Sequence, residues 1–254
     1  MRWNLKELRN DVEHIHGKEQ RDILSPCLES IIDRKHYARY HFQEFERLIT
    51  EFLKGKEDEV SLFKLVLGSD DEQNMEFYRC RKMVEANVVA CLQSMHAISD
   101  ILSHVIYFSL NMGSDSDLKL SPRKISLHNV KDKISNKPDY SKLFSLIEQF
   151  TNHQDYRYLV DIVNHSKHRS IVGTSFTVDI SGESGRPHGL EFVAFSYEQR
   201  NHYKRWIDDY LNSEYRRQDP LTIEIGNEIN SLVRKVLTNK GKSCAPALSV
   251  MFKE

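Results

Sequence analysis

The sequence has little of the chemistry that turns and disulfides need. Only 10 glycines and 6 prolines occur in 254 residues, which argues against a protein of many short strands. The cysteines are few and show no Cys-x-x-Cys pair, which excludes a zinc knuckle and predicts reduced thiols in a cytosol-like compartment. They stand at Cys27, Cys80, Cys91 and Cys244.

Long apolar runs and a surplus of one charge are lacking as well. No apolar run approaches the roughly 18 residues that span a bilayer, and residues 1–17 carry charges throughout, so we expect a cytoplasmic protein without a membrane partner. The formal net charge of −1 excludes a wholly basic nucleic-acid coat. Residues 118–142 are a local exception, because they contain seven lysines or arginines and only two aspartates. This stretch predicts a solvated basic face, with RNA contact as the less favoured interpretation.

The apolar spacing predicts a mainly α protein, a helical bundle with one β-hairpin inserted toward its C-terminal side. We expect a single domain over residues 1–254, because no flexible linker divides it. Its predicted parts are N-terminal helices, a helical core, a β-hairpin, and C-terminal helices with a tail. They cover residues 1–67, 71–170, 171–197 and 198–254, respectively.

Prolines and glycines predict where several helices begin and end. Ser25-Pro26 predicts the start of a long helix that ends near Gly55. Residues 71–112 contain no proline or glycine, which predicts one very long helix or two in succession. Near the C-terminus we expect a helix over 198–215, a break at Pro220 and a final helix.

The densest group of reactive side chains lies in residues 161–169. At about 100° per residue, one helix face carries Asp161, Asn164, His165 and His168. Two imidazoles beside Lys167 and Arg169 suit phosphate chemistry, because histidine can accept and donate protons near neutral pH while cations stabilise a phosphorane. The alternative is a polar helix end whose cations favour the helix dipole.

A second polar face lies on the apolar helix expected over residues 84–110. It carries Glu85, His96 and Asp100, and charged groups on such a helix require partners. We therefore predict that this face meets the Asp161–His168 face, with Asp100 or Glu85 orienting a histidine. The alternative is a hydrogen-bonded core network without catalysis.

A metal site is the third interpretation. His96, Asp100 and His104 are spaced four residues apart, as helical zinc or iron ligands can be. A di-iron centre needs Glu-x-x-His pairs on two helices, and the sequence does not supply two such pairs. It also has no Gly-rich phosphate loop, and we expect neither metal nor cofactor.

The string Asn164-x-x-Lys167-His168-Arg169 at a helix end resembles the HEPN superfamily, over about residues 71–170. The resemblance implies a helical bundle that forms a homodimer and acts on RNA as a metal-independent endoribonuclease of a prokaryotic toxin or defence system. Asn164 and His168 match the family's polar residue and histidine, with His165 as a second acid–base group and Lys167 or Arg169 binding phosphate. Val163 stands where the family has arginine, so the alternative is a non-catalytic interaction or regulatory module that dimerises through the same face.

Overall fold

The structure is a computed structural model that describes residues 2–56, 58–67, 71–179 and 186–243. Its α-helices are α1 Leu5–His16, α2 Lys18–Leu53, α3 Glu59–Leu67, α4 Asp71–Ser109, α5 Leu127–Ile134, α6 Ser141–Thr151, α7 Gln154–His168 and α8 Ile207–Ser243. Short 3-10 turns lie at Met112–Ser114, Pro122–Lys124 and Pro138–Tyr140. The strands are β1 Thr174–Val178, β2 His188–Phe192, β3 Phe195–Tyr197, β4 Arg200–His202 and β5 Arg205–Trp206.

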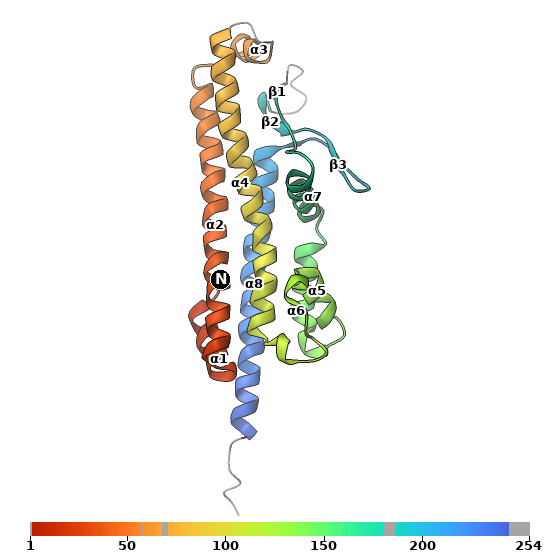
Figure 1. Ribbon diagram of the computed structural model, residues 1–254. Helices are drawn as coiled ribbons and strands as arrows, with labels where there is room; N and C mark the ends of the chain where they lie inside the picture. Colours follow the sequence, from red (N-terminus) through yellow and green to blue (C-terminus); the bar gives the residue numbers. More distant parts are fainter. Residues whose placement is uncertain (1, 57, 68–70, 180–185, 244–254) are drawn as a thin grey trace, which may run out of the picture. The chain divides into compact units, whose positions relative to one another are not determined.

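The predicted fold class is confirmed, since the chain is mainly helical with a small antiparallel sheet toward its C-terminal side (Figure 1). The expected hairpin is β1 and β2, paired antiparallel from Thr174 opposite Phe192 to Val178 opposite His188. Alternate residues of β1 are buried at Thr174 and Phe176. That period of two is the pattern expected of a strand with one face on a core.

Three boundary predictions are wrong. Helix α2 begins at Lys18 and contains Pro26, and α8 continues through Pro220. Proline removes one intrahelical hydrogen bond, but the fully buried Leu24 and Leu28 on either side of Pro26 anchor α2 across the gap. Part of the helix expected over 198–215 is instead the strands β4 and β5, and α8 begins at Ile207.

Residues 71–109 form one continuous helix, α4. Among the described residues, its stretch Asn74–Ser109 is the one helix long and apolar enough to cross a membrane by length and composition, and 61% of its most apolar window is buried. A buried core helix of a soluble protein passes the same test. This feature therefore does not by itself indicate a membrane span.

Contacts divide the chain into two compact units, each assembled from separated segments. The first comprises Met1–Ile31, Ser99–Gln149 and Pro220–Glu254, and the second comprises Ile32–Ile98 and Phe150–Asp219. The predicted parts of the chain do not follow this division, because α2, α4 and α8 each supply residues to both units.

The first unit is entirely helical in its described part. Its core joins the two ends of the chain, because the Trp3 indole donates to Asn230 Oδ1 on α8 at 3.0 Å. Gly226, one turn away, provides the space for that indole: a Cβ built there would lie 2.2 Å from the Trp3 ring. A residue without a side chain is therefore required at this contact.

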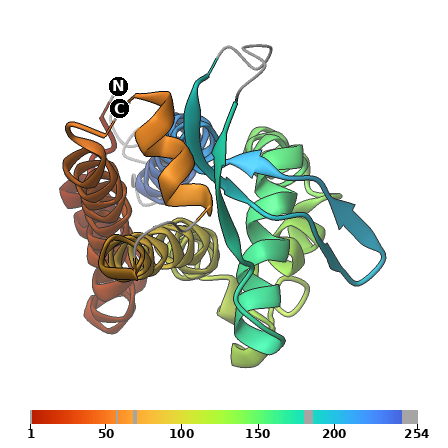
Figure 2. The same ribbon diagram turned by 90° about the horizontal axis from the view of Figure 1, so that it is seen from above.

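The second unit carries the strands. A three-stranded sheet has the order β1-β2-β5, and β3 pairs with β4 in a separate hairpin. Helix α3 lies against β1, and the β3–β4 hairpin extends beside α7 (Figure 2). Aromatic and aliphatic side chains from α4, α7, α8 and the sheet form one core cluster beneath these strands.

Candidate functional site

The C-terminal half of α7 and the β3–β4 hairpin are joined through one buried carboxylate. Asp161 is 1% exposed, and its two oxygens accept from Arg200 Nε and Nη2 at 2.7 Å each. His202 Nε2 lies 2.7 Å from Asp161 Oδ2. The hydrogen bonds from Arg200 to this carboxylate raise the pKa of the guanidinium. Asp161 thus fixes the position of β4 on α7 through charge-assisted bonds.

Aromatic rings support the same contact. The imidazole of His202 stacks on Phe195 with ring centroids 4.7 Å apart and meets Tyr158 edge-on at 5.1 Å. His165 lies edge-on to Phe195 at 5.6 Å, and its Nδ1 donates to the Ser170 carbonyl at 2.7 Å. The Nδ1–H bond leaves Nε2 of His165 as the nitrogen able to accept a proton.

The end of α7 and the hairpin together present cations, imidazoles and aromatic rings. The Arg169 guanidinium lies 4.8 Å from the centre of the Tyr197 ring, in cation–π contact. His168 and Lys167 are exposed, and within the described part of the chain neither side chain has a hydrogen bond or ion pair. We call this region the α7–hairpin surface, comprising His165, Lys167, His168, Arg169, Tyr197, Arg200 and Tyr203.

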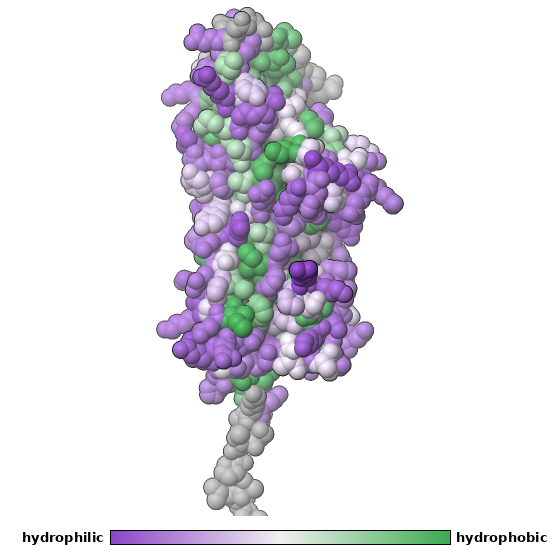
Figure 3. All heavy atoms as spheres, in the orientation of Figure 1, coloured by the Kyte–Doolittle hydropathy of each residue, from purple (hydrophilic) through white to green (hydrophobic). Residues whose placement is uncertain are grey.

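Figure 3 shows that the surface around this hairpin is predominantly hydrophilic. Its most exposed large ring is Tyr203, at 85%. The surface thus contains an exposed aromatic ring, and its Lys167 has no ion pair among the described residues. Proteins bind single-stranded nucleic acids with such groups, by base stacking and phosphate contact.

Glu85 and Asp100 are the two residues predicted to orient a histidine, and the structure gives their contacts. The Glu85 carboxylate accepts from the Thr174 hydroxyl at 2.7 Å and from Lys82 Nζ at 2.6 Å. Burial raises the pKa of Glu85, but these two hydrogen bonds, together with the charges of Lys82 and Arg81, outweigh burial and hold the pKa below its usual value. His96 is buried on α4 within the same unit.

Asp100 belongs to the first unit and Asp161 to the second, so their predicted meeting stays a prediction. The carbonyl oxygen of Asp100 accepts from Nδ1 of His104 at 3.0 Å, a bond within α4. Asn164, the residue matched to the family's polar position, is half-buried on α7.

Sequence reasoning missed Arg200 and His202. Their signal was a period of two through Phe195, Tyr197, Arg200 and His202, interrupted by a two-residue turn. That turn places Glu198 at φ +52°, a left-handed conformation usually marked by glycine or asparagine. Position 198 is neither glycine nor asparagine, and the residues of the hairpin also suit a helix. The sequence therefore did not predict this hairpin.

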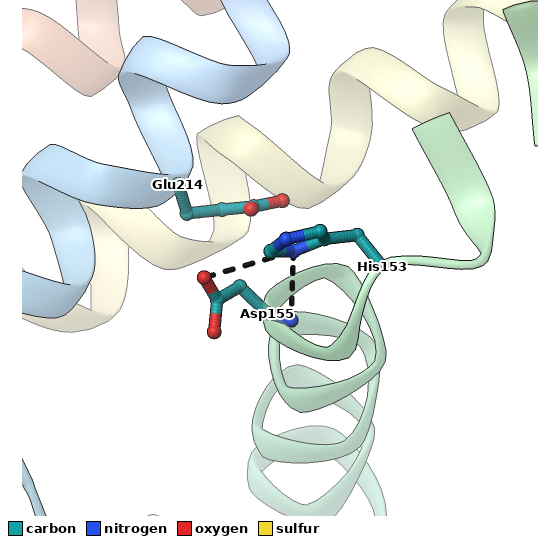
Figure 4. Close-up of side chains that lie close together, drawn as sticks. All are labelled: His153, Asp155 and Glu214. Carbon is teal, nitrogen blue, oxygen red and sulfur yellow. Dashed lines mark hydrogen bonds and ion pairs between the residues drawn. The ribbon is translucent and has the colours of Figure 1, made fainter. Parts of the chain in front are cut away.

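One other cluster has the composition of a metal site. His153, Asp155 and Glu214 place potential ligand atoms within 4.8 Å of one another (Figure 4). Both carboxylates already have cationic partners: Arg205 binds Asp155 at 2.5 Å, and Arg217 binds both oxygens of Glu214 at 2.7 and 2.8 Å. Since His153 Nδ1 accepts from the Asp155 backbone N–H as the helix cap, these contacts describe a buried ion-pair network that fixes the start of α7.

The basic stretch over 118–142 lies in the first unit and is partly neutralised. Lys142 Nζ binds the buried Glu228 at 2.5 Å, Lys137 binds Asp117 at 3.2 Å, and Lys131 lies 3.9 Å from Glu148. These pairs agree with the interpretation of a solvated, internally balanced face.

Tyr158 is expected to tolerate loss of its hydroxyl. The residue is 1% exposed, and its hydroxyl has no hydrogen-bond partner in the described part of the chain. Burial raises the pKa of this phenol. Because an unpaired buried hydroxyl costs free energy, Tyr158→Phe should leave the free energy of unfolding unchanged or raise it by about 1 kcal/mol.

Tyr210 provides the matched control in urea unfolding. Its hydroxyl donates to the Asp155 carbonyl at 2.9 Å in a buried position, so Tyr210→Phe should lower the free energy of unfolding by about 1–2 kcal/mol. A loss of the same size in Tyr158→Phe would contradict the prediction.

Comparison with known proteins adds no family to these observations. No protein-family model, curated protein or solved structure matches the chain.

Proposed function

We propose that the protein acts on RNA through the α7–hairpin surface, as a HEPN-like metal-independent endoribonuclease. The observation that carries the proposal is His168, an exposed imidazole beside Lys167 and Arg169 that has no hydrogen bond or ion pair with any residue that the structure describes. An exposed, unengaged imidazole is accessible to a substrate and able to exchange protons with it.

The chemistry assigns each group a role. One imidazole of His165 and His168 removes the proton from a ribose 2′-hydroxyl, whose oxygen then attacks the adjacent phosphorus. The bond from phosphorus to the 5′ oxygen breaks, the other imidazole protonates that oxygen, and a 2′,3′-cyclic phosphate remains. Lys167 or Arg169 stabilises the charge on the phosphorane, and Asn164 positions the substrate.

A specific observation supports a second candidate, a non-catalytic interaction or regulatory module that dimerises through the same face. Val163, which stands where the resembling family has arginine, is 1% exposed and belongs to the core cluster. A buried valine supplies no charge to a phosphorane, so Lys167 or Arg169 has to replace the missing cation if cleavage occurs. Under either candidate, the resemblance implies a homodimer, which sedimentation of the purified chain would test.

Cleavage of a labelled single-stranded RNA in EDTA tests the enzyme proposal. His168→Ala should reduce the rate by about 10²–10⁴-fold, because general acid–base groups contribute that much. The matched control is His128→Ala, which removes an imidazole that is 76% exposed on α5 and should leave the rate unchanged. An equal rate in wild type and His168→Ala would refute the assignment of His168.

Absence of cleavage in wild type, combined with RNA binding that weakens in Arg169→Gln, would instead favour the non-catalytic module. Such binding should also weaken as salt rises, because phosphate contacts release counterions.

A further inference from the structure

A cavity of about 350 Å³ lies between α2 and the first turns of α8, within the second unit. None of the residues that line it belongs to the α7–hairpin surface. The polar residues of its lining include Arg39 and Gln43 on α2 and Asn212 and Arg216 on α8. The spacing of four residues in each pair places both members on the same face of their helix.

These four side chains are available to a ligand. None of them has a hydrogen bond or ion pair among the residues that the structure describes. The nearby carboxylates on α8 are engaged elsewhere, since Asp219 is bound by Lys35 and Glu214 is bound by Arg217. Two guanidinium groups thus line one cavity without an anionic partner.

The rest of the cavity wall is mainly apolar and includes one carboxylate, which can accept a hydrogen bond. Phe42, Leu211 and the ring of Tyr215 provide apolar surface. Glu46 also lines the cavity, seven residues from Arg39 along α2, and so about two helical turns away. Burial and then the charge of Asp208 raise the pKa of Glu46, and neither arginine of the cavity contributes to this shift. The cavity therefore has a cationic part, an apolar wall and a separate acceptor.

Glu46 also lines a larger cavity of about 480 Å³, whose chemistry differs. Its arginine, Arg186, is already bound by Asp208 and Asp209. In the smaller cavity, by contrast, the two arginines outnumber the single carboxylate, that of Glu46, and neither arginine has an ion pair among the described residues.

We propose that the Arg39–Arg216 cavity binds a small phosphate monoester carrying a planar ring, of the size of a nucleoside 5′-monophosphate. The two guanidinium groups bind the phosphate, the amides of Gln43 and Asn212 donate to its oxygens, and the ring packs on Phe42 and Tyr215. Arginine suits this role because its planar fork matches phosphate oxygens. The cavity volume lies within the range of about 300–1,000 Å³ typical of small-molecule sites.

Calorimetric titration of the full chain with AMP, GMP, CMP and UMP tests the proposal, with adenosine and inorganic phosphate as partial ligands. At least one monophosphate should bind, and about tenfold or more tightly than either partial ligand. Arg39→Gln combined with Arg216→Gln should weaken that binding about tenfold or more, because charge-assisted hydrogen bonds are lost. Both positions are exposed, and circular dichroism verifies that the variant remains folded.

Two controls locate the site. Arg47→Gln removes the same charge from α2, at a residue bound to Glu44 and Glu51, and should leave binding unchanged. His168→Ala should also leave it unchanged, which separates this cavity from the α7–hairpin surface. The proposal is overturned if no monophosphate binds wild type, if inorganic phosphate binds as tightly as the best monophosphate, or if the double variant binds normally.

Discussion

Asp161→Asn is expected to lower the free energy of unfolding by about 2–3 kcal/mol. The carboxylate is buried and is the shared acceptor for Arg200 and His202. An amide retains the volume but loses the charge, and its NH₂ group faces donors. Removing one partner of a buried ion pair costs about 3–5 kcal/mol, and the exposed part of Arg200, 51% of its side chain, places this case at or below that range.

Urea unfolding measures this loss, and Glu198→Gln is its matched control. Glu198 also approaches Arg200, at 3.5 Å, but is 61% exposed, so its loss should change the free energy of unfolding by less than about 0.5 kcal/mol. Similar small changes in both variants would show that Asp161 does not hold the hairpin on α7.

Gly226→Ala is expected to destabilise the protein by about 2 kcal/mol, although alanine is the better helix former. The intrinsic gain of the substitution within a helix is about 1 kcal/mol. This gain is opposed by steric overlap, because the new Cβ would lie 2.2–2.7 Å from atoms of the Trp3 ring. Relieving this overlap requires moving a rigid indole and its bond to Asn230, and overpacking of this kind costs about 1–3 kcal/mol or more.

The Trp3→Ala background reverses the expected sign. With the indole removed, Gly226→Ala should stabilise the protein by up to about 1 kcal/mol, giving a coupling of about 3 kcal/mol between the two positions. Thermal and urea unfolding of the four proteins in this cycle measure the coupling. Additive effects of the two substitutions would refute the predicted contact.

The sequence was most informative where periodicity was strong. The apolar spacing along α4 and the alternation in β1 were each sufficient to predict the helix and the strand that the structure contains. The prolines misled because proline weakens a helix locally, whereas the buried residues around Pro26 hold it through long-range packing. Such packing is not visible from neighbours in the sequence.

The candidate site was predictable only in its helical half. Asn164, His165 and His168 lie on a single helix, so their shared face follows from helical geometry. Arg200 and His202 reach Asp161 from 39 and 41 positions away. Their contact depends on a tight turn at Glu198, whose sequence bears no turn signature. Local rules therefore identified His165 and His168 but not Arg200 and His202, which bind the buried carboxylate of Asp161.

The pairing of Trp3 with Asn230 has a consequence for synthesis of the chain. These residues are 227 positions apart, so the Trp3 indole, just before α1, cannot form this contact until the corresponding part of α8 has emerged from the ribosome. The indole must therefore remain without this partner while the 227 residues up to Asn230 are translated. Contacts of such long sequence separation slow folding and prolong exposure of apolar surface. Truncation within α8 should consequently release the N-terminal helices to proteases and chaperones.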